Sequence, residues 1–63
     1  MKNLPEDLID EFMGFMAAHD NDDLPDGAWF QCLQDAAEFF IGLHHLKGFD
    51  ENDLAHFYIS KIG

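Results

Sequence analysis

The stretch AWFQCLQDAAEFFIGLHHL, residues 28–46, decides the fold because most of its side chains are apolar. Apolar residues recur in it with the period of an α-helix, which turns about 100° per residue. The polar positions gather within about 60° of Gln31 on either side. They are Gln31, Gln34, Asp35, Glu38, Gly42 and His45. The rest of the circumference is apolar except for His44, so the apolar arc covers more than half of the helix.

This wide apolar arc has a centre and two flanks. The centre holds Trp29, Leu33, Phe40 and Leu43. One flank holds Ala28, Cys32, Phe39 and Leu46, and the other holds Phe30, Ala37 and Ile41. A surface helix needs an apolar stripe only somewhat wider than about 100°. Two interpretations stay open: two shorter helices cover both flanks, or an apolar patch remains exposed and binds a protein, most simply a second copy of the chain.

Helix-start signals on both sides of this stretch predict two further helices. Residues 3–6, with sequence NLPE, are typical of a helix start, with Asn3 as the N-cap. Residues 23–26, with sequence DLPD, repeat the pattern and start the long second helix, with Asp26 as an alternative cap. A third start follows Asp50, which is an N-cap residue with an acid three positions later.

These signals predict helices over about residues 4–19, 24–47 and 51–62, within a single domain that spans residues 1–63. The chain has neither Val nor Thr, which removes two main strand-forming residues. We therefore expect an all-α fold: a compact three-helix bundle of a short, a long and a short helix. If an apolar patch stays exposed, a homodimer through the second helix is expected.

The charge balance restricts the class of partner. Thirteen Asp and Glu face three Lys and no Arg, which gives a net charge of −10. Such a chain repels nucleic acid and anionic membranes and attracts basic surfaces. We expect a protein partner with a basic surface, no direct binding of nucleic acid and no membrane association. Cys32 is the only cysteine, and residues 1–10 lack the apolar core of a signal peptide, so we expect a reducing, cytoplasmic location.

No residue pattern indicates catalysis, a cofactor or a metal. Ser60 is the only serine, and Cys32 has no basic neighbour to stabilise its thiolate. In a calcium-binding EF-hand frame that starts at Asp22 of the acidic loop, Leu24 and Leu33 fill the third and twelfth positions, which require oxygen ligands. We expect no enzyme, no cofactor and no metal site, and weak binding of a divalent ion by residues 20–26 is the one alternative left open.

The carboxylates gather at four places along the chain and, with aromatic anchors from the second helix, predict the binding residues. The expected partner-binding residues are Asp7, Asp10, Glu11, Asp20, Asp22, Asp23, Asp26, Trp29, Asp35, Glu38 and His44. We expect a small acidic helical module that regulates or inhibits a larger, basic-surfaced protein, a type found among accessory proteins of phages and mobile elements. The alternatives are a DNA mimic that inhibits a nucleic-acid enzyme, and a structural homodimer or small subunit with no inhibitory role.

Overall fold

The structure, a computed structural model, describes residues 4–63, and this part of the chain forms three α-helices. α1 spans Glu6–His19, α2 spans Asp26–His44 and α3 spans Glu51–Ile62. No strand occurs among residues 4–63, so the predicted all-α, three-helix architecture is confirmed for them. None of the helices in this range is long and apolar enough to cross a membrane.

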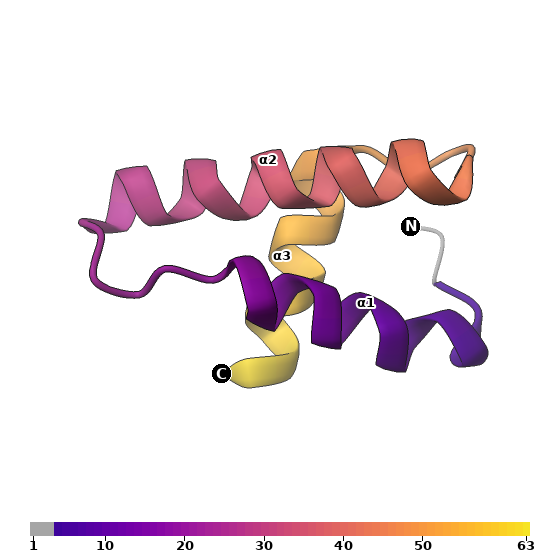
Figure 1. The fold of residues 1–63 in the computed structure, drawn as a ribbon, viewed down its shortest axis with the longest axis horizontal. Coiled ribbons are helices and arrows are strands. Elements are labelled where there is room, and N and C mark those ends of the chain that lie inside the picture. Colours follow the sequence, from indigo (N-terminus) through magenta and orange to yellow (C-terminus); the bar gives the residue numbers. More distant parts are fainter. Residues whose placement is uncertain (1–3) are drawn as a thin grey trace.

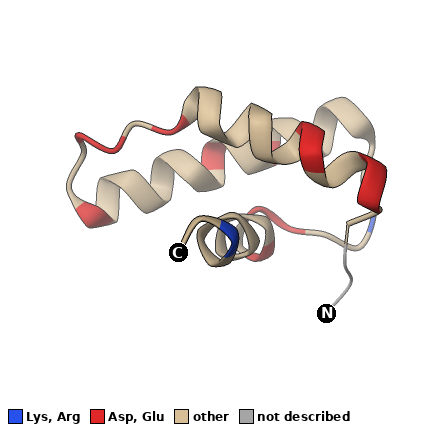
Figure 2. Cartoon of the chain, turned by 90° about the horizontal axis from the view of Figure 1, so that it is seen from below, with Lys and Arg blue, Asp and Glu red and all other residues tan. Residues whose placement is uncertain are grey.

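The helices form two layers. α1 and α2 run antiparallel, joined by the acidic loop, and α3 crosses behind them (Figure 1). Figure 2 shows α3 nearly end-on, on one side of the layer that α1 and α2 make. No helix of residues 4–63 covers the opposite side of this layer. The arrangement therefore buries one side of the α1–α2 pair and leaves the other accessible.

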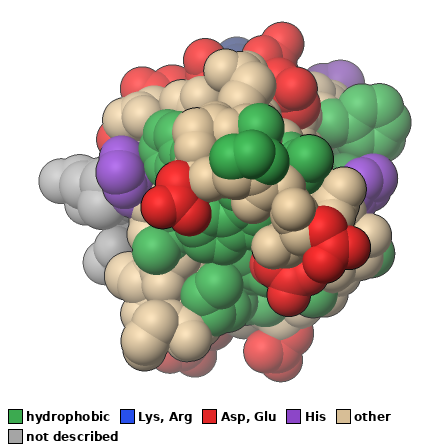
Figure 3. Space-filling view, turned by 90° about the vertical axis from the view of Figure 1, so that its left-hand side faces the viewer, with side chains coloured by type: hydrophobic (Ala, Val, Ile, Leu, Met, Phe, Trp, Pro, Cys, Tyr) green, Lys and Arg blue, Asp and Glu red, His purple; other side chains and the backbone are tan. Residues whose placement is uncertain are grey.

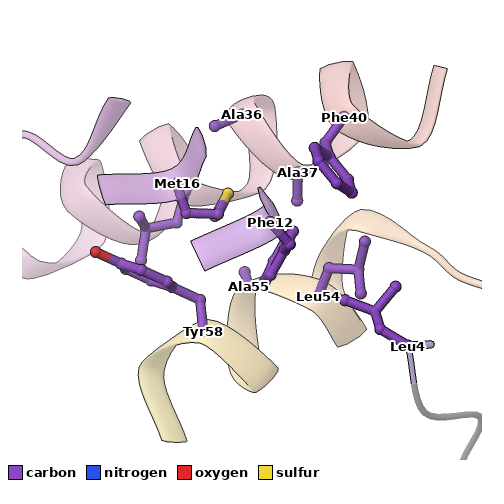
Figure 4. Packing of buried hydrophobic residues seen from close by; sticks show 10 residues of the cluster. Leu4, Phe12, Met16, Ala36, Ala37, Phe40, Leu54, Ala55 and Tyr58 are labelled. Atoms are coloured by element: carbon purple, nitrogen blue, oxygen red, sulfur yellow. The ribbon is translucent and has the colours of Figure 1, made fainter. Parts of the chain in front are cut away.

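The core lies between the α1–α2 layer and α3, and Figure 4 shows its side chains converging from the three helices. The buried residues are Leu4, Phe12, Met16, Leu33, Ala36, Ala37, Phe40, Leu54, Ala55 and Tyr58. Phe12 of α1 packs edge-on against Phe40 of α2, with ring centroids 5.2 Å apart, and also lies 5.9 Å from the ring of Phe57. Aromatic pairs of this geometry add to the stabilisation that burial itself provides.

The starts of α1 and α2 differ from the predicted ones. The predicted cap Asn3 lies outside the described residues, and within the described chain no side chain caps the N-terminus of α1 or α2. α2 begins at Asp26, near the alternative start, because residues 21–24 form a turn. Asn21 Oδ1 accepts a hydrogen bond from the Asp23 N–H at 3.3 Å, and the Asn21 carbonyl accepts one from the Leu24 N–H at 3.3 Å. This local turn replaces the first helical residues that we predicted.

α2 also ends earlier than predicted, at His44 and not at Lys47. His45 adopts the left-handed conformation, with φ 53° and ψ 43°, and the Leu46 N–H donates to the Ile41 carbonyl at 3.1 Å. A left-handed residue followed by such a bond terminates a helix. Gly48, the predicted end signal, lies in the bend that follows and has a φ of 84°. α3 starts as predicted, because Asp50 Oδ1 accepts a 2.8 Å hydrogen bond from the N–H of Asp53.

Candidate protein-binding surface

The uncovered side of the α1–α2 layer carries apolar side chains from both helices. We call it the open face and define it by Phe15, His19, Ala28, Cys32, Phe39 and Leu43. Phe39 is 61% exposed and Leu43 is 55% exposed, although both are large apolar residues. Phe15 stacks on Phe39 with ring centroids 6.0 Å apart, which links the two helices here. Of the two interpretations of the apolar arc, the structure favours the exposed patch.

A groove of about 450 Å³ runs along this face. Its lining residues are His19, Ala28, Gln31, Cys32, Asp35, Ala36 and Phe39. The hollow exists because Ala28, Cys32 and Ala36 are small and follow one another at four-residue intervals on one side of α2. The Cys32 thiol donates to the His19 carbonyl at 3.3 Å, which holds the end of α1 against this row.

Carboxylates border the open face. Asp35 lines the groove, where its Oδ1 accepts a hydrogen bond from Gln31 Nε2 at 3.0 Å. Glu38 is exposed on the adjacent polar side of α2. On α1, Asp7 and Glu11 precede Phe15 by eight and four residues, so they extend the same side of the helix. Figure 3, which looks at the end with the acidic loop, shows apolar side chains reaching the surface between groups of carboxylates.

Asp20 has a structural role that the sequence did not suggest. Its Oδ1 accepts a hydrogen bond from Trp29 Nε1 at 2.6 Å, and its Oδ2 accepts one from the Tyr58 hydroxyl at 2.8 Å. One carboxylate thus joins the end of α1 to both α2 and α3. Burial, the hydrogen bond to Asp20, and the charges of Asp20 and Asp22 together raise the pKa of Tyr58 to about 12.

His44 lies at the boundary between the core and solvent. Its ring centroid is 4.3 Å from that of Phe40, and its Nε2 lies 3.8 Å from Glu11 Oε2, with 27% of the histidine side chain exposed. The pair is an ion pair only when the imidazole is protonated. His44, predicted as a partner-binding residue, therefore lies at the contact between α1 and α2.

The predicted binding residues do not form one cluster. Glu11 and His44 come together, and Asp20 and Trp29 bind each other within the fold. Asp35 joins the groove, whereas Asp10 lies on a side of α1 turned away from Phe15. The other five acids are exposed and spread over the loop and the helices α1 and α2. They are Asp22, Asp23 and Asp26 in or next to the loop, Asp7 on α1 and Glu38 on α2.

Sequence reasoning missed the residues that dominate the open face. Phe39 and Leu43 were assigned to the apolar arc, but nothing in the sequence states which part of that arc α1 and α3 leave uncovered. Their i, i+4 spacing places them on one side of α2, and this spacing is the signal that groups them. His19 also lines the groove, and no sequence pattern marks it as a binding residue.

Within residues 4–63, no group of three or more His, Cys, Asp and Glu side chains is placed to hold a metal ion. No protein-family model matches the chain, and no curated protein and no solved structure shows significant similarity to it. The open face is therefore the feature of the described chain that bears on its function.

Proposed function

We propose that this chain is an acidic protein-binding module that regulates or inhibits a larger protein with a basic surface, and that the open face makes the contact. The observation that carries the proposal is the exposure of Phe39 and Leu43 beside an apolar groove, on a chain with a net charge of −10. Exposed apolar patches of this kind mark interaction sites.

The two properties of the surface have separate roles. Covering Phe39 and Leu43 would contribute about 1–2 kcal/mol for each side chain, because each is already partly covered in the free protein. The carboxylates add little net affinity at an exposed rim, but they select a positively charged partner and accelerate its approach. Apolar contact thus contributes most of the binding free energy, and the carboxylates determine which class of partner binds.

A homodimer is the second candidate, because a second copy would bury the same exposed Phe39 and Leu43 in a two-fold interface. Each copy carries a net charge of −10, however, so self-association brings like charges together. Sedimentation equilibrium at low and high salt separates the candidates. A monomer at low salt supports the proposal, whereas a stable dimer under those conditions favours the homodimer.

Photo-crosslinking in cells tests the proposal directly. Benzoylphenylalanine in place of Leu43 should capture a discrete partner with a basic surface, and the same group in place of the similarly exposed Ile62 on α3 should not. With the purified partner, we expect the double variant Phe39→Ser, Leu43→Ser to lose about tenfold or more in affinity. Ile62→Ser should bind within about twofold of the original chain.

The partner's own activity should change when the module binds. The proposal is wrong if the partner crosslinks equally from both positions, or if the double variant binds as well as Ile62→Ser. If the partner is a nucleic-acid enzyme and DNA competes for the module through its carboxylates while Phe39→Ser, Leu43→Ser has no effect, the module is a DNA mimic instead.

A further inference from the structure

The open face has the length and shape to accommodate a helix. Ala28, Cys32, Phe39 and Leu43 recur at helical intervals along α2, so the row is straight and about 22 Å long. Phe15 of α1 stacks on Phe39, and the His19 carbonyl accepts from the Cys32 thiol, so α1 forms the second wall of the row. A straight trough between two antiparallel helices is a position in which a further helix can pack against both of them.

We infer that the partner presents an amphipathic helix of about four turns, with Lys and Arg on its polar side, which lies along α2 on the face of the α1–α2 layer opposite α3. This inference rests on the proposed function and names the partner segment that the open face accepts. The apolar side of that helix covers Phe39 and Leu43.

The groove sets the main apolar contact. Its floor is made by Ala28, Cys32 and Ala36, whose short side chains leave space for a leucine or phenylalanine of the incoming helix. Phe39 closes one end of this space and supplies an aromatic surface for that side chain to pack against. A helix with only small side chains would leave the space empty and lose these contacts.

The charges around the open face select a basic helix. Asp35 and Glu38 lie along one border on α2, and Asp7 and Glu11 extend the other border on α1. Lys and Arg residues that flank the apolar side of a helix have long side chains, whose charged ends can reach such carboxylates at the rim of the interface. A helix flanked by Asp and Glu would place like charges opposite these residues and be repelled.

A set of designed peptides tests the inference in purified form. The probe is an amphipathic Leu/Lys peptide of about 16 residues; its controls are a Leu/Glu peptide with the same apolar pattern and a Leu/Lys peptide with scrambled order. We expect the amphipathic Leu/Lys peptide to bind about 100-fold more tightly than the Leu/Glu peptide and about tenfold more tightly than the scrambled one. Amide NMR shifts should follow residues 15–19 and 28–43, and not α3.

Matched variants locate the contact. Ala28→Leu fills the groove on an exposed helical position and should weaken binding of the Leu/Lys peptide about tenfold. Ala17→Leu makes the same change on a side of α1 turned away from the open face, and should leave the affinity within about twofold. Because both positions are exposed, neither change disturbs the core, and circular dichroism with urea unfolding checks that the fold is kept.

The inference is overturned if the scrambled peptide binds as tightly as the amphipathic one, if the NMR shifts centre on α3, or if Ala28→Leu has no effect. Its failure differs from failure of the proposed function. A partner that crosslinks from Leu43 but is not displaced by the Leu/Lys peptide disproves the helical occupant and leaves the proposed function standing. A partner that crosslinks equally from Ile62 removes the proposed function whatever the peptide does.

Discussion

The two flanks of α2 are equally apolar in sequence and differ in what covers them. On one flank Ala37 is fully buried, and the Phe30 ring lies 5.0 Å from that of His56 on α3. On the other flank Ala28 is exposed and Phe39 is 61% exposed. The cause is geometric: α3 has 12 residues and crosses a 19-residue helix on one side only. Hydrophobicity shows that a surface can be buried, and the path of the neighbouring helix determines which surface is.

The largest expected difference in stability is between variants of two adjacent phenylalanines, Phe39 and Phe40. Phe40 is fully buried, so Phe40→Ala should destabilise the protein by about 3–5 kcal/mol, enough to unfold a domain of this size. Phe39→Ala removes the same atoms from the open flank and should cost less than about 1 kcal/mol. Urea unfolding followed by circular dichroism measures both. Equal losses for the two variants would show that the flank with Phe39 is covered as fully as the centre of the arc with Phe40.

Asp20 and Asp35 extend the comparison between covered and open parts of the molecule to carboxylates. Asp20→Ala leaves the Trp29 N–H and the Tyr58 hydroxyl without their acceptor, so we expect a loss of about 2–4 kcal/mol. Asp35→Ala at the groove removes one exposed hydrogen bond with Gln31 and should change stability by no more than about 0.5 kcal/mol. The midpoints of thermal unfolding for the two variants report this difference, and similar midpoints would contradict the structural role of Asp20.

Alkaline titration of Tyr58 tests the side of the α1–α2 layer that α3 covers. The pKa of Tyr58 rises from its usual 10.0 to about 12, first through burial and then through its bond to Asp20. A raised pKa means that Tyr58 keeps its proton in the folded protein at a pH where the unfolded chain loses it. The contribution of Tyr58 to the free energy of unfolding is therefore complete below about pH 10. This contribution, on the order of 2 kcal/mol, is lost as the pH rises from about 10 to about 12.

Tyr58→Phe is the control for this titration. It should lower stability at neutral pH by about 1 kcal/mol through loss of one hydrogen bond, and it should flatten the decline between about pH 10 and 12. Urea unfolding at a series of pH values compares the two proteins. A decline of equal steepness in both would assign the alkaline effect to groups other than Tyr58.

The sequence predicted what depends on local chemistry. The cap at Asp50 was predictable because its partner, the N–H of Asp53, is three residues away. The bonds from Asp20 to Trp29 and Tyr58 join residues 9 and 38 positions apart, so no local pattern indicates them. The same limit applies to Phe39, whose exposure depends on where α3 crosses. The end of α2 was missed because His45 takes a left-handed conformation for which glycine is the usual signal.

The accessibility of Leu43, with and without a partner helix, tests the central claim most directly. Methyl NMR with a soluble paramagnetic reagent compares Leu43 with Leu33, which lies on the same helix and is fully buried. In the free protein the reagent should relax Leu43 strongly and leave Leu33 almost unaffected. The amphipathic Leu/Lys peptide should protect Leu43 and leave the exposed Ile62 unprotected. Equal protection of Leu43 and Leu33 in the free, dilute protein, or no protection by the peptide, would contradict an open flank that receives a basic helix.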